Sequence, residues 1–246
     1  MTEQDRRAQL WAKLLAEEQK APRSASRMSV LGALCVSELT VTGAGATVLS
    51  QQQHGDGDGQ SPRRGLVHAT NAVSTGLEDL QLTVGEGPCL DAFASGGPVL
   101  IADLARETAR WPGFTPGALK LGAAAVFSFP LQVGVVRLGS LDVYRETPSP
   151  LSSGEVADAL ILADLATATI MVELDGHATE DSSWLADEHA EIHQASGMVQ
   201  VQLGITTQAA LLRLRAHAYT HQQELSDVAR QVVTRRLRLT PDDEPA

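Results

Sequence analysis

The chain has 246 residues, with 19 basic and 30 acidic side chains and a formal net charge of −11 at pH 7. Its 43% hydrophobic content supports a packed core and excludes a wholly disordered chain. Two cysteines exclude a disulfide framework, and neither a secretory signal nor a membrane-spanning apolar run is evident. We therefore expect a cytoplasmic protein of one large or two small domains, with no membrane partner and an average charge that repels nucleic acid.

The first 150 residues predict a mixture of helices and strands. Segments with helical apolar spacing cover an N-terminal arm (1–23, helical to Lys20), 28–40, 74–82 and a short stretch beginning at Pro88. Segments with strand character cover 46–50, 65–69, 98–102, 125–131 and 133–144. The last two strands are expected to be antiparallel neighbours.

Ser152 and Ser153 can cap a helix over residues 152–174 that is apolar on two faces. Such a helix needs two partners, namely its own sheet and another helix, for which a second subunit is a candidate. One face carries Val156, Ala159, Leu160, Ala163, Ala166 and Ile170, and the other Leu162, Leu165 and Val172.

Past a polar, acidic linker predicted at 176–183, three more helices are expected within residues 184–240. Gly204 closes the first, while Thr206 and Ser226 are the expected caps of the second and third. The connections are short, which predicts a three-helix bundle followed by an acidic tail at 241–246. The second helix carries Ala209, Leu212, Ala216 and Tyr219 on one face; the third is expected to bury Leu225, Val228, Ala229 and Val232.

The net charge hides a division along the chain. Residues 189–239 contain six arginines and three acidic residues, a local charge of +3, which leaves −14 for the rest. Arginine suits bidentate contacts with phosphate, although solvated charge at helix ends is the plainer interpretation. The six arginines are Arg213, Arg215, Arg230, Arg235, Arg236 and Arg238.

No motif predicts a metal, a cofactor or an enzyme. The Asp-Gly run at 56–60 departs from a calcium-binding loop, and no catalytic triad or paired-carboxylate spacing is present. Two histidine pairs, at 189 and 193 and at 217 and 221, lack the glutamate of a metalloprotease, although a structural four-histidine site is an alternative. Cys89 lies at a predicted helix start, where a lowered pKa would make it redox-responsive; a small buried side chain is the alternative.

Residues 80–144 resemble the GAF domains of actinobacterial regulators. The motifs that carry the resemblance lie at 80–82, 85–92, 98–104, 110–114, 128–131 and 138–144. It implies a domain over residues 24–175 with a central antiparallel sheet, helices on its faces and a pocket for an unidentified small molecule. The expected pocket residues are Phe127, Phe129, Trp111 and Tyr144.

Residues 192–239 resemble an ANTAR domain, the RNA-binding module of transcription antiterminators. The motifs lie at 194–199, 203–206, 209–210, 214–218, 225–229 and 232–233. The resemblance implies a bundle that binds RNA stem-loops, usually as a dimer. Ser196 departs from the lysine common there, and Tyr219 is expected in the core, with base stacking as the alternative. The expected RNA-binding residues are Gln194, Ser196, Arg213, Arg215, Arg230, Arg235, Arg236 and Arg238.

The sequence thus predicts an α+β protein, with a GAF-like antiparallel sheet flanked by helices followed by an all-α three-helix ANTAR bundle. The expected function is that of a homodimeric, signal-responsive antitermination regulator in which the helix at 152–174 couples sensing to RNA binding. One alternative is a ligand-binding or dimerisation protein without RNA binding. Another is a redox sensor that uses Cys89.

Overall fold

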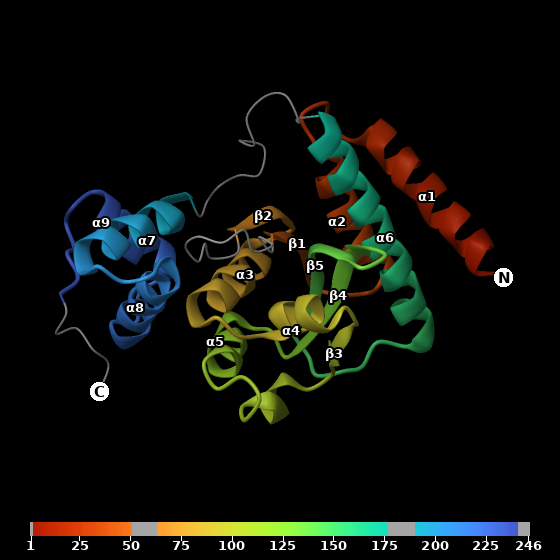
Figure 1. Cartoon of the computed structure of the whole chain (residues 1–246). Coiled ribbons are helices and arrows are strands. Elements are labelled where there is room, and N and C mark those ends of the chain that lie inside the picture. The colour runs from red at the N-terminus through yellow and green to blue at the C-terminus, as the bar shows by residue number, and fades with distance from the viewer. Residues whose placement is uncertain (1, 51–62, 177–189, 241–246) are drawn as a thin grey trace.

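The computed structural model describes residues 2–50, 63–176 and 190–240, and these form two lobes (Figure 1). The larger lobe is a sheet between two layers of helices, and the smaller one is a bundle of the last three helices. Among the described helices, none combines the length and apolar character needed to cross a membrane. The predicted linker at 176–183, apart from its first residue, and the acidic tail at 241–246 lie outside the described residues.

The sheet has five strands, and every neighbouring pair is antiparallel. The predicted pairing of 125–131 with 133–144 is confirmed, with Ser128 directly opposite Asp142 and Thr47 opposite Ser140. Paired residues share a face of the sheet, so this register decides which side chains meet. In spatial order the strands are β2 (Arg63–Ala69), β1 (Gly43–Ser50), β5 (Val136–Arg145), β4 (Ala125–Val133) and β3 (Val99–Ile101).

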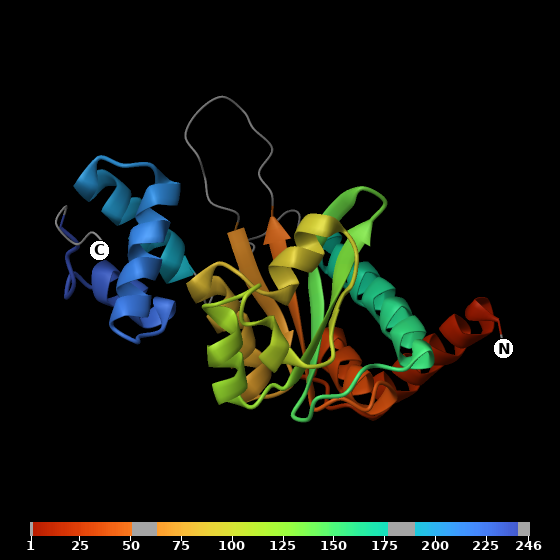
Figure 2. The same ribbon diagram turned by 90° about the horizontal axis from the view of Figure 1, so that it is seen from below.

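One face of the sheet is covered by α2 (Arg27–Glu38) and α6 (Ser153–Gly176), and α1 (Glu3–Lys20) packs on the outer side of these two helices (Figure 2). The apolar stripes that predicted these helices are buried here against alternate strand residues. The second apolar face of α6 packs against α1 and α2 of the same chain, so the additional helical partner does not have to come from another subunit. The shared core includes Leu10, Leu31, Phe127, Phe129, Leu141, Val143, Leu162 and Ala166.

The opposite face is covered by α3 (Ala72–Val84), α4 (Pro88–Ser95) and α5 (Phe114–Leu121), with a 3-10 turn at Leu104–Glu107 (Figure 2). The sequence did not predict α5, because Pro112, Gly113, Pro116 and Gly117 are typical of a loop. Pro116 lies in the first turn of α5, where proline is tolerated since the N–H groups have no helical partner. The core of this face includes Leu77, Trp111, Phe114, Val126 and Tyr144.

The smaller lobe contains α7 (Ala190–Leu203), α8 (Thr207–Thr220) and α9 (Leu225–Val233). Gly204 follows α7 in the left-handed region (φ 66°), and the Thr206 hydroxyl caps α8, both as predicted. The predicted cap Ser226 is wrong: the cap position is occupied by Glu224, two residues earlier, and α9 begins at Leu225. The bundle core comprises Ile192, Ala195, Val199, Ala210, Leu214, Ala218, Leu225, Val228, Ala229, Val232 and Leu239, joined by Leu82 of α3.

Candidate functional site

The last turns of the bundle present three of the predicted RNA-binding arginines. The chain leaves α9 through Arg235, which has a positive φ of 60°, and Arg235, Arg236 and Arg238 are all exposed. Leu239 is buried in the bundle core, and the Gln202 side-chain amide donates to its carbonyl oxygen. The segment 235–239 is therefore anchored to the bundle. It holds the three guanidinium groups near the negative end of the α9 dipole.

The other predicted RNA-binding residues of α7 and α9 differ in how far their side chains are exposed for contact with RNA. Gln194 is exposed on α7, but Ser196 is buried and its hydroxyl donates to the Ile192 carbonyl over 2.8 Å. Ser196 is therefore part of the bundle interior and does not present a polar group at the surface. Arg230 is exposed, but it forms ion pairs with Glu191 (3.2 Å) and Asp227 (3.1 Å) that offset its charge.

Arg215 lies at the contact between the two lobes. Its Nε atom donates to the carbonyl oxygen of Leu82 on α3 over 3.0 Å, and the Leu82 side chain packs into the bundle core. Gly85 ends α3 with φ 74°, and a Cβ atom there would lie 2.8 Å from Arg215 Nη1. Arg213 and Arg215 are both half-buried on α8. Arg215 is thus committed to the lobe contact, which the sequence could not indicate.

The face of α8 that carries Leu212 and Tyr219 points outward. Tyr219 is 67% exposed, so the expectation that it belongs to the core is wrong. The buried face is instead formed by Ala210, Leu214 and Ala218, which follow the i, i+4, i+8 spacing of a helix. Leucine and arginine alternate over residues 212–215 and alanine recurs on both sides of His217, so apolar residues occur all round α8 and its two faces are hard to distinguish from sequence.

His217 of α8 and His221, which follows the end of that helix, stack on each other. The rings of His217 and His221 stack at 4.0 Å between centroids, and His221 Nδ1 is hydrogen-bonded to the His217 carbonyl over 2.9 Å. The backbone at 193 belongs to α7, but nothing is described of its side chain, and residue 189 lies outside the described part. The four-histidine alternative therefore stays a prediction.

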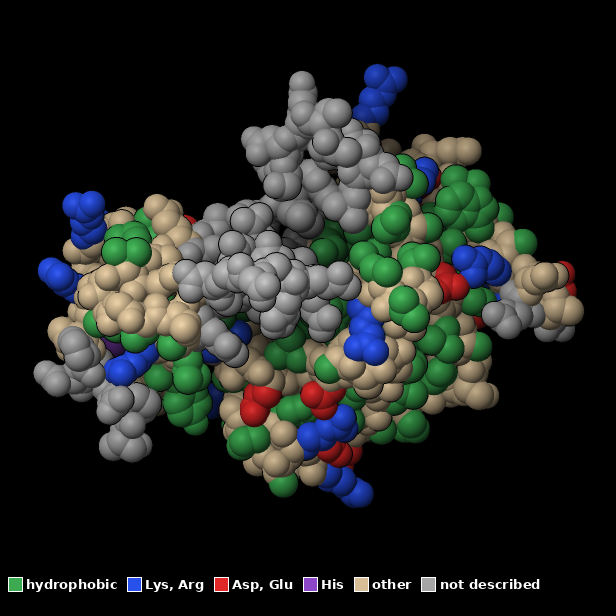
Figure 3. All heavy atoms as spheres, in the orientation of Figure 1, with side chains coloured by type: hydrophobic (Ala, Val, Ile, Leu, Met, Phe, Trp, Pro, Cys, Tyr) green, Lys and Arg blue, Asp and Glu red, His purple; other side chains and the backbone are tan. Residues whose placement is uncertain are grey.

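Basic side chains lie at several separate points over α7–α9, with little acidic surface between them (Figure 3). This distribution agrees with the local charge of +3 counted along the sequence. Scattered guanidinium groups suit a few phosphate contacts, each of which adds to the salt dependence of binding.

A buried polar cluster lies inside the larger lobe, between the sheet and helices α3 and α4. Oxygen atoms of Glu78 and Asp142 and the sulfur of Cys89 all lie within 4.8 Å of one another. Thr47 Oγ1 donates to Glu78 Oε2 over 2.8 Å, and Ser140 Oγ donates to Asp142 Oδ2 over 2.7 Å. All five side chains are buried.

Burial changes the chemistry of this cluster. Desolvation, and then the negative charge of Glu78, raise the pKa of the Asp142 carboxyl well above its ordinary value. Cys89 is completely buried and its main-chain N–H donates to Gln81 Oε1 over 2.8 Å. Reactive redox cysteines are usually partly exposed, so this burial does not favour the Cys89 redox alternative.

The four aromatic residues expected around a ligand are all buried, but they lie on two faces of the sheet. Phe127 and Phe129 pack against the α1–α2–α6 layer, whereas Trp111 and Tyr144 pack under α3 and α5. The structure therefore does not bring the four together around one cavity. Trp111 and Tyr144 lie on the same side of the sheet as the buried polar cluster.

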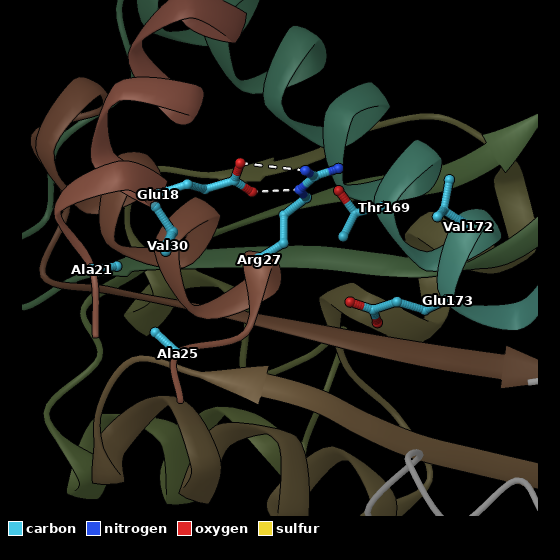
Figure 4. Close-up of a pocket in the computed structure, with 8 residues that line it drawn as sticks. All are labelled: Glu18, Ala21, Ala25, Arg27, Val30, Thr169, Val172 and Glu173. Atoms are coloured by element: carbon cyan, nitrogen blue, oxygen red, sulfur yellow. Dashed lines mark hydrogen bonds and ion pairs between the residues drawn. The ribbon is translucent and has the colours of Figure 1, made fainter. Parts of the chain in front are cut away.

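A surface pocket of about 420 Å³ lies where the α1–α2 connection meets the C-terminal half of α6 (Figure 4). Arg27 points across it and pairs with the Glu18 carboxylate, so the two charges satisfy each other. Thr169 lines the pocket, but its hydroxyl donates to the Leu165 carbonyl over 2.9 Å. This pocket is on the other side of the sheet from the polar cluster and contains none of the predicted ligand residues.

Comparisons with known proteins agree with this division into two lobes. Residues 186–233 match the ANTAR domain family, which covers α7, α8 and α9. No curated protein matches the chain significantly.

Two solved structures resemble the larger lobe. The GAF domain of a phosphoenolpyruvate-protein phosphotransferase from Acinetobacter has 14% identity and a TM-score of 0.50, over 72% of this chain and 99% of that one. The N-acylhomoserine lactone dependent LuxR family transcription factor CepR2 from Burkholderia cenocepacia has 18% identity and a TM-score of 0.51, over 68% and 96%. At such identities the similarity shows the fold of the larger lobe alone, an antiparallel sheet flanked by helices as in GAF domains. The helical bundle that follows it coincides with the ANTAR match.

The sequence analysis missed Glu78 and Asp142. Two signals could have indicated them: Asp142 is the one acidic residue within the apolar strand β5, and Glu78 lies on the apolar side of α3 near Leu77 and Gln81. Buried carboxylates are rare unless they are paired, so an acidic residue at either position indicates a buried polar partner.

Proposed function

We propose that this chain is a signal-responsive regulator of transcription antitermination that acts in the cytoplasm and binds RNA stem-loops through residues 190–240. The observation that carries the proposal is the match of residues 186–233 to the ANTAR family, together with the three exposed arginines held beyond α9. The larger lobe is the sensory part, and its ligand changes how the bundle is presented.

The surface of the bundle suits a short RNA hairpin. Arg235, Arg236 and Arg238 offer planar donors for phosphate oxygens, and Gln194 is exposed for a polar contact. Tyr219 presents an exposed aromatic ring on which an unpaired loop base can stack. The acidic remainder of the chain discourages indiscriminate binding of RNA.

Coupling between the lobes is proposed to pass through α3. Leu82 packs into the bundle core, and Arg215 donates to the Leu82 carbonyl. Glu78 of the same helix belongs to the buried polar cluster. A change in the cluster that moves α3 therefore reaches α8 directly. This route replaces a direct link from the helix predicted at 152–174, whose connection to the bundle lies outside the described residues.

Binding of RNA is tested by titrating the full chain against labelled double hairpins that overlap a terminator, at several salt concentrations. Arg236→Ala should weaken binding by about 3- to 10-fold and reduce the slope of log affinity against log salt by about 0.7 to 1. Arg106→Ala is the matched control, because Arg106 is an 83% exposed arginine on the larger lobe and should leave both quantities unchanged. Equal and negligible binding by all three proteins would favour the alternative of a ligand-binding protein without RNA binding.

The proposed active form is a homodimer. Leu160, Met171 and Val172 of α6 remain exposed, although α1 and α2 cover much of that helix. Such apolar side chains on a helix that already packs within its own chain are suited to a contact between copies. Light scattering of the full chain should give twice the monomer mass of 26.0 kDa, and a strict monomer at working concentrations would contradict a dimer.

A further inference from the structure

The buried cluster of Glu78, Cys89 and Asp142 has the composition of a metal site. We propose that it binds a divalent transition-metal cation such as Zn²⁺, through one thiolate and two carboxylates. Three protein ligands leave a fourth position for an exogenous group, as in reactive zinc sites. The inference deepens the sensory role proposed above, on which its biological meaning rests, by naming the chemical class of the ligand.

The three ligands come from different elements and converge without any of them being exposed. Glu78 lies on α3, Cys89 in the first turn of α4 and Asp142 on β5, and their ligand atoms lie within 4.8 Å of one another. With metal–ligand bonds of about 2.0 to 2.3 Å, tetrahedral ligands lie roughly 3.3 to 3.8 Å apart, so closure needs a contraction of at most about 1 to 1.5 Å. Small side-chain rotations supply such a movement.

Neighbouring hydroxyl groups orient both carboxylates. Thr47 holds Oε2 of Glu78, and Ser140 holds Oδ2 of Asp142. Hydrogen bonds of this kind commonly fix the direction of metal ligands.

Two facing buried polar atoms at the cluster favour a bound ligand. Asp142 Oδ1 and Ser128 Oγ are inaccessible to solvent, and neither has a hydrogen-bond partner at good distance and angle among the described residues, although Ser128 lies close enough to Asp142 to lower the pKa of its carboxyl. Ser128 is fully buried directly opposite Asp142 on the same face of the sheet, so its hydroxyl borders the same space. Buried polar atoms without partners are costly, and a bound cation would satisfy Asp142 Oδ1.

The backbone before Cys89 fixes the thiol in place. Gly87 has φ 139°, and a Cβ atom there would lie 2.5 Å from Gln81 Oε1, the atom that accepts the Cys89 N–H. Cys89 therefore stays at the N-terminal turn of α4, where the helix dipole favours a thiolate. A side chain at position 87 would push Gln81 away and displace the thiol.

The proposal is tested on the full chain, stripped of metal with a chelator, by titration with Co²⁺. One equivalent should bind with a thiolate-to-cobalt charge-transfer band, and Zn²⁺ should displace it. Cys89→Ser should abolish the band and weaken Co²⁺ binding by at least about 10-fold. Loss of a residue that only hydrogen-bonds to a metal ligand already lowers metal affinity by about 10-fold or more. Cys35→Ser is the matched control, because Cys35 is the other buried thiol and lies in the core on the opposite side of the sheet.

A band that is absent from the unmodified protein, or that survives in Cys89→Ser, would overturn the site. If Cys89→Ser does not fold, the unmodified protein still tests the site. Its melting temperature should rise with Zn²⁺, and an unchanged melting temperature would overturn the proposal. Asp142→Asn should reduce that rise. All these measurements are made without RNA, so a failed metal site leaves the RNA-binding proposal standing, and failed RNA binding leaves the metal site standing.

Discussion

The two lobes use large side chains and charges in opposite ways. All four phenylalanines of the chain lie in the larger lobe, whereas four of the eleven core residues that the bundle itself supplies are alanines. The larger lobe also encloses charged groups, whereas the bundle buries no arginine completely and exposes Arg230, Arg235, Arg236 and Arg238. Bulky residues fill the space between a sheet and its helices, and alanines allow three helices to approach closely.

Because of this difference, the residues that indicate function are of different kinds in the two lobes. In the bundle, the informative residues are exposed and their net charge can be counted along the sequence. In the larger lobe, the informative residues are two acidic groups that are buried at a cost in desolvation. A search limited to exposed charges would find the first site and miss the second.

The largest effect is expected from the core of the larger lobe. Phe129→Ala should lower the free energy of unfolding by about 3 to 5 kcal/mol, because it removes a fully buried ring between the sheet and α6. Urea denaturation followed by tryptophan fluorescence measures the change. Val135→Ala, at a position that is 94% exposed, should stay within about 0.5 kcal/mol. A small loss for Phe129→Ala would show that aromatic packing does not distinguish the two lobes.

The next effect concerns the buried charge and depends on pH. Because burial and Glu78 raise the pKa of Asp142, the folded chain binds more protons than the unfolded chain above the ordinary value of 3.8. The contribution of Asp142 therefore makes the free energy of unfolding fall as pH rises from about 4. Asp142→Asn should flatten this decline, measured by urea denaturation with a chelator present. Asp91→Asn, which changes a carboxylate that is 40% exposed and pairs with Arg110, should keep the original slope.

A smaller effect tests how the N-terminal helix is attached. Arg6 bridges Asp158 on α6 (2.6 and 2.7 Å) and Glu38 on α2 (3.0 Å), so Arg6→Ala should cost about 1 to 2 kcal/mol. Arg7→Ala is the neighbouring control, because Arg7 pairs with Asp164 at an exposed position and should cost less than about 0.5 kcal/mol. Equal losses in the free energy of unfolding for the two variants, measured by thermal or urea denaturation, would mean that the charge of the arginine, and not its bridging geometry, holds α1 in place.

The smallest expected change lies in the bundle. Thr206→Ala removes the side-chain acceptor for the Ala209 N–H and should cost about 1 kcal/mol. Thr220→Ala, at the other end of α8, changes the same side chain without removing a cap and should be close to neutral. Urea denaturation followed by circular dichroism compares the two variants. If they behave alike, the cap does not contribute to the stability of α8.

Much of the fold could be predicted from local patterns. Nearly every helix and strand of the larger lobe was expected, because its apolar residues repeat at helical or strand spacing and its ends carry serine, proline or glycine. Two local patterns gave the wrong expectation. The proline and glycine residues near the start of α5 are typical of a loop, although packing stabilises a helix there. The mixed sequence of α8 made its outward face resemble a buried one.

The site was predictable only where it lies on the surface. The sequence by itself determined the order of elements, the two resemblances and the local positive charge of residues 189–239, since these depend on neighbours along the chain. Tertiary structure decided that Arg215 holds α3, that Ser196 is internal, and that Glu78, Cys89 and Asp142 meet. These residues lie on separate elements, so strand register and helix packing, and not sequence spacing, set their distances.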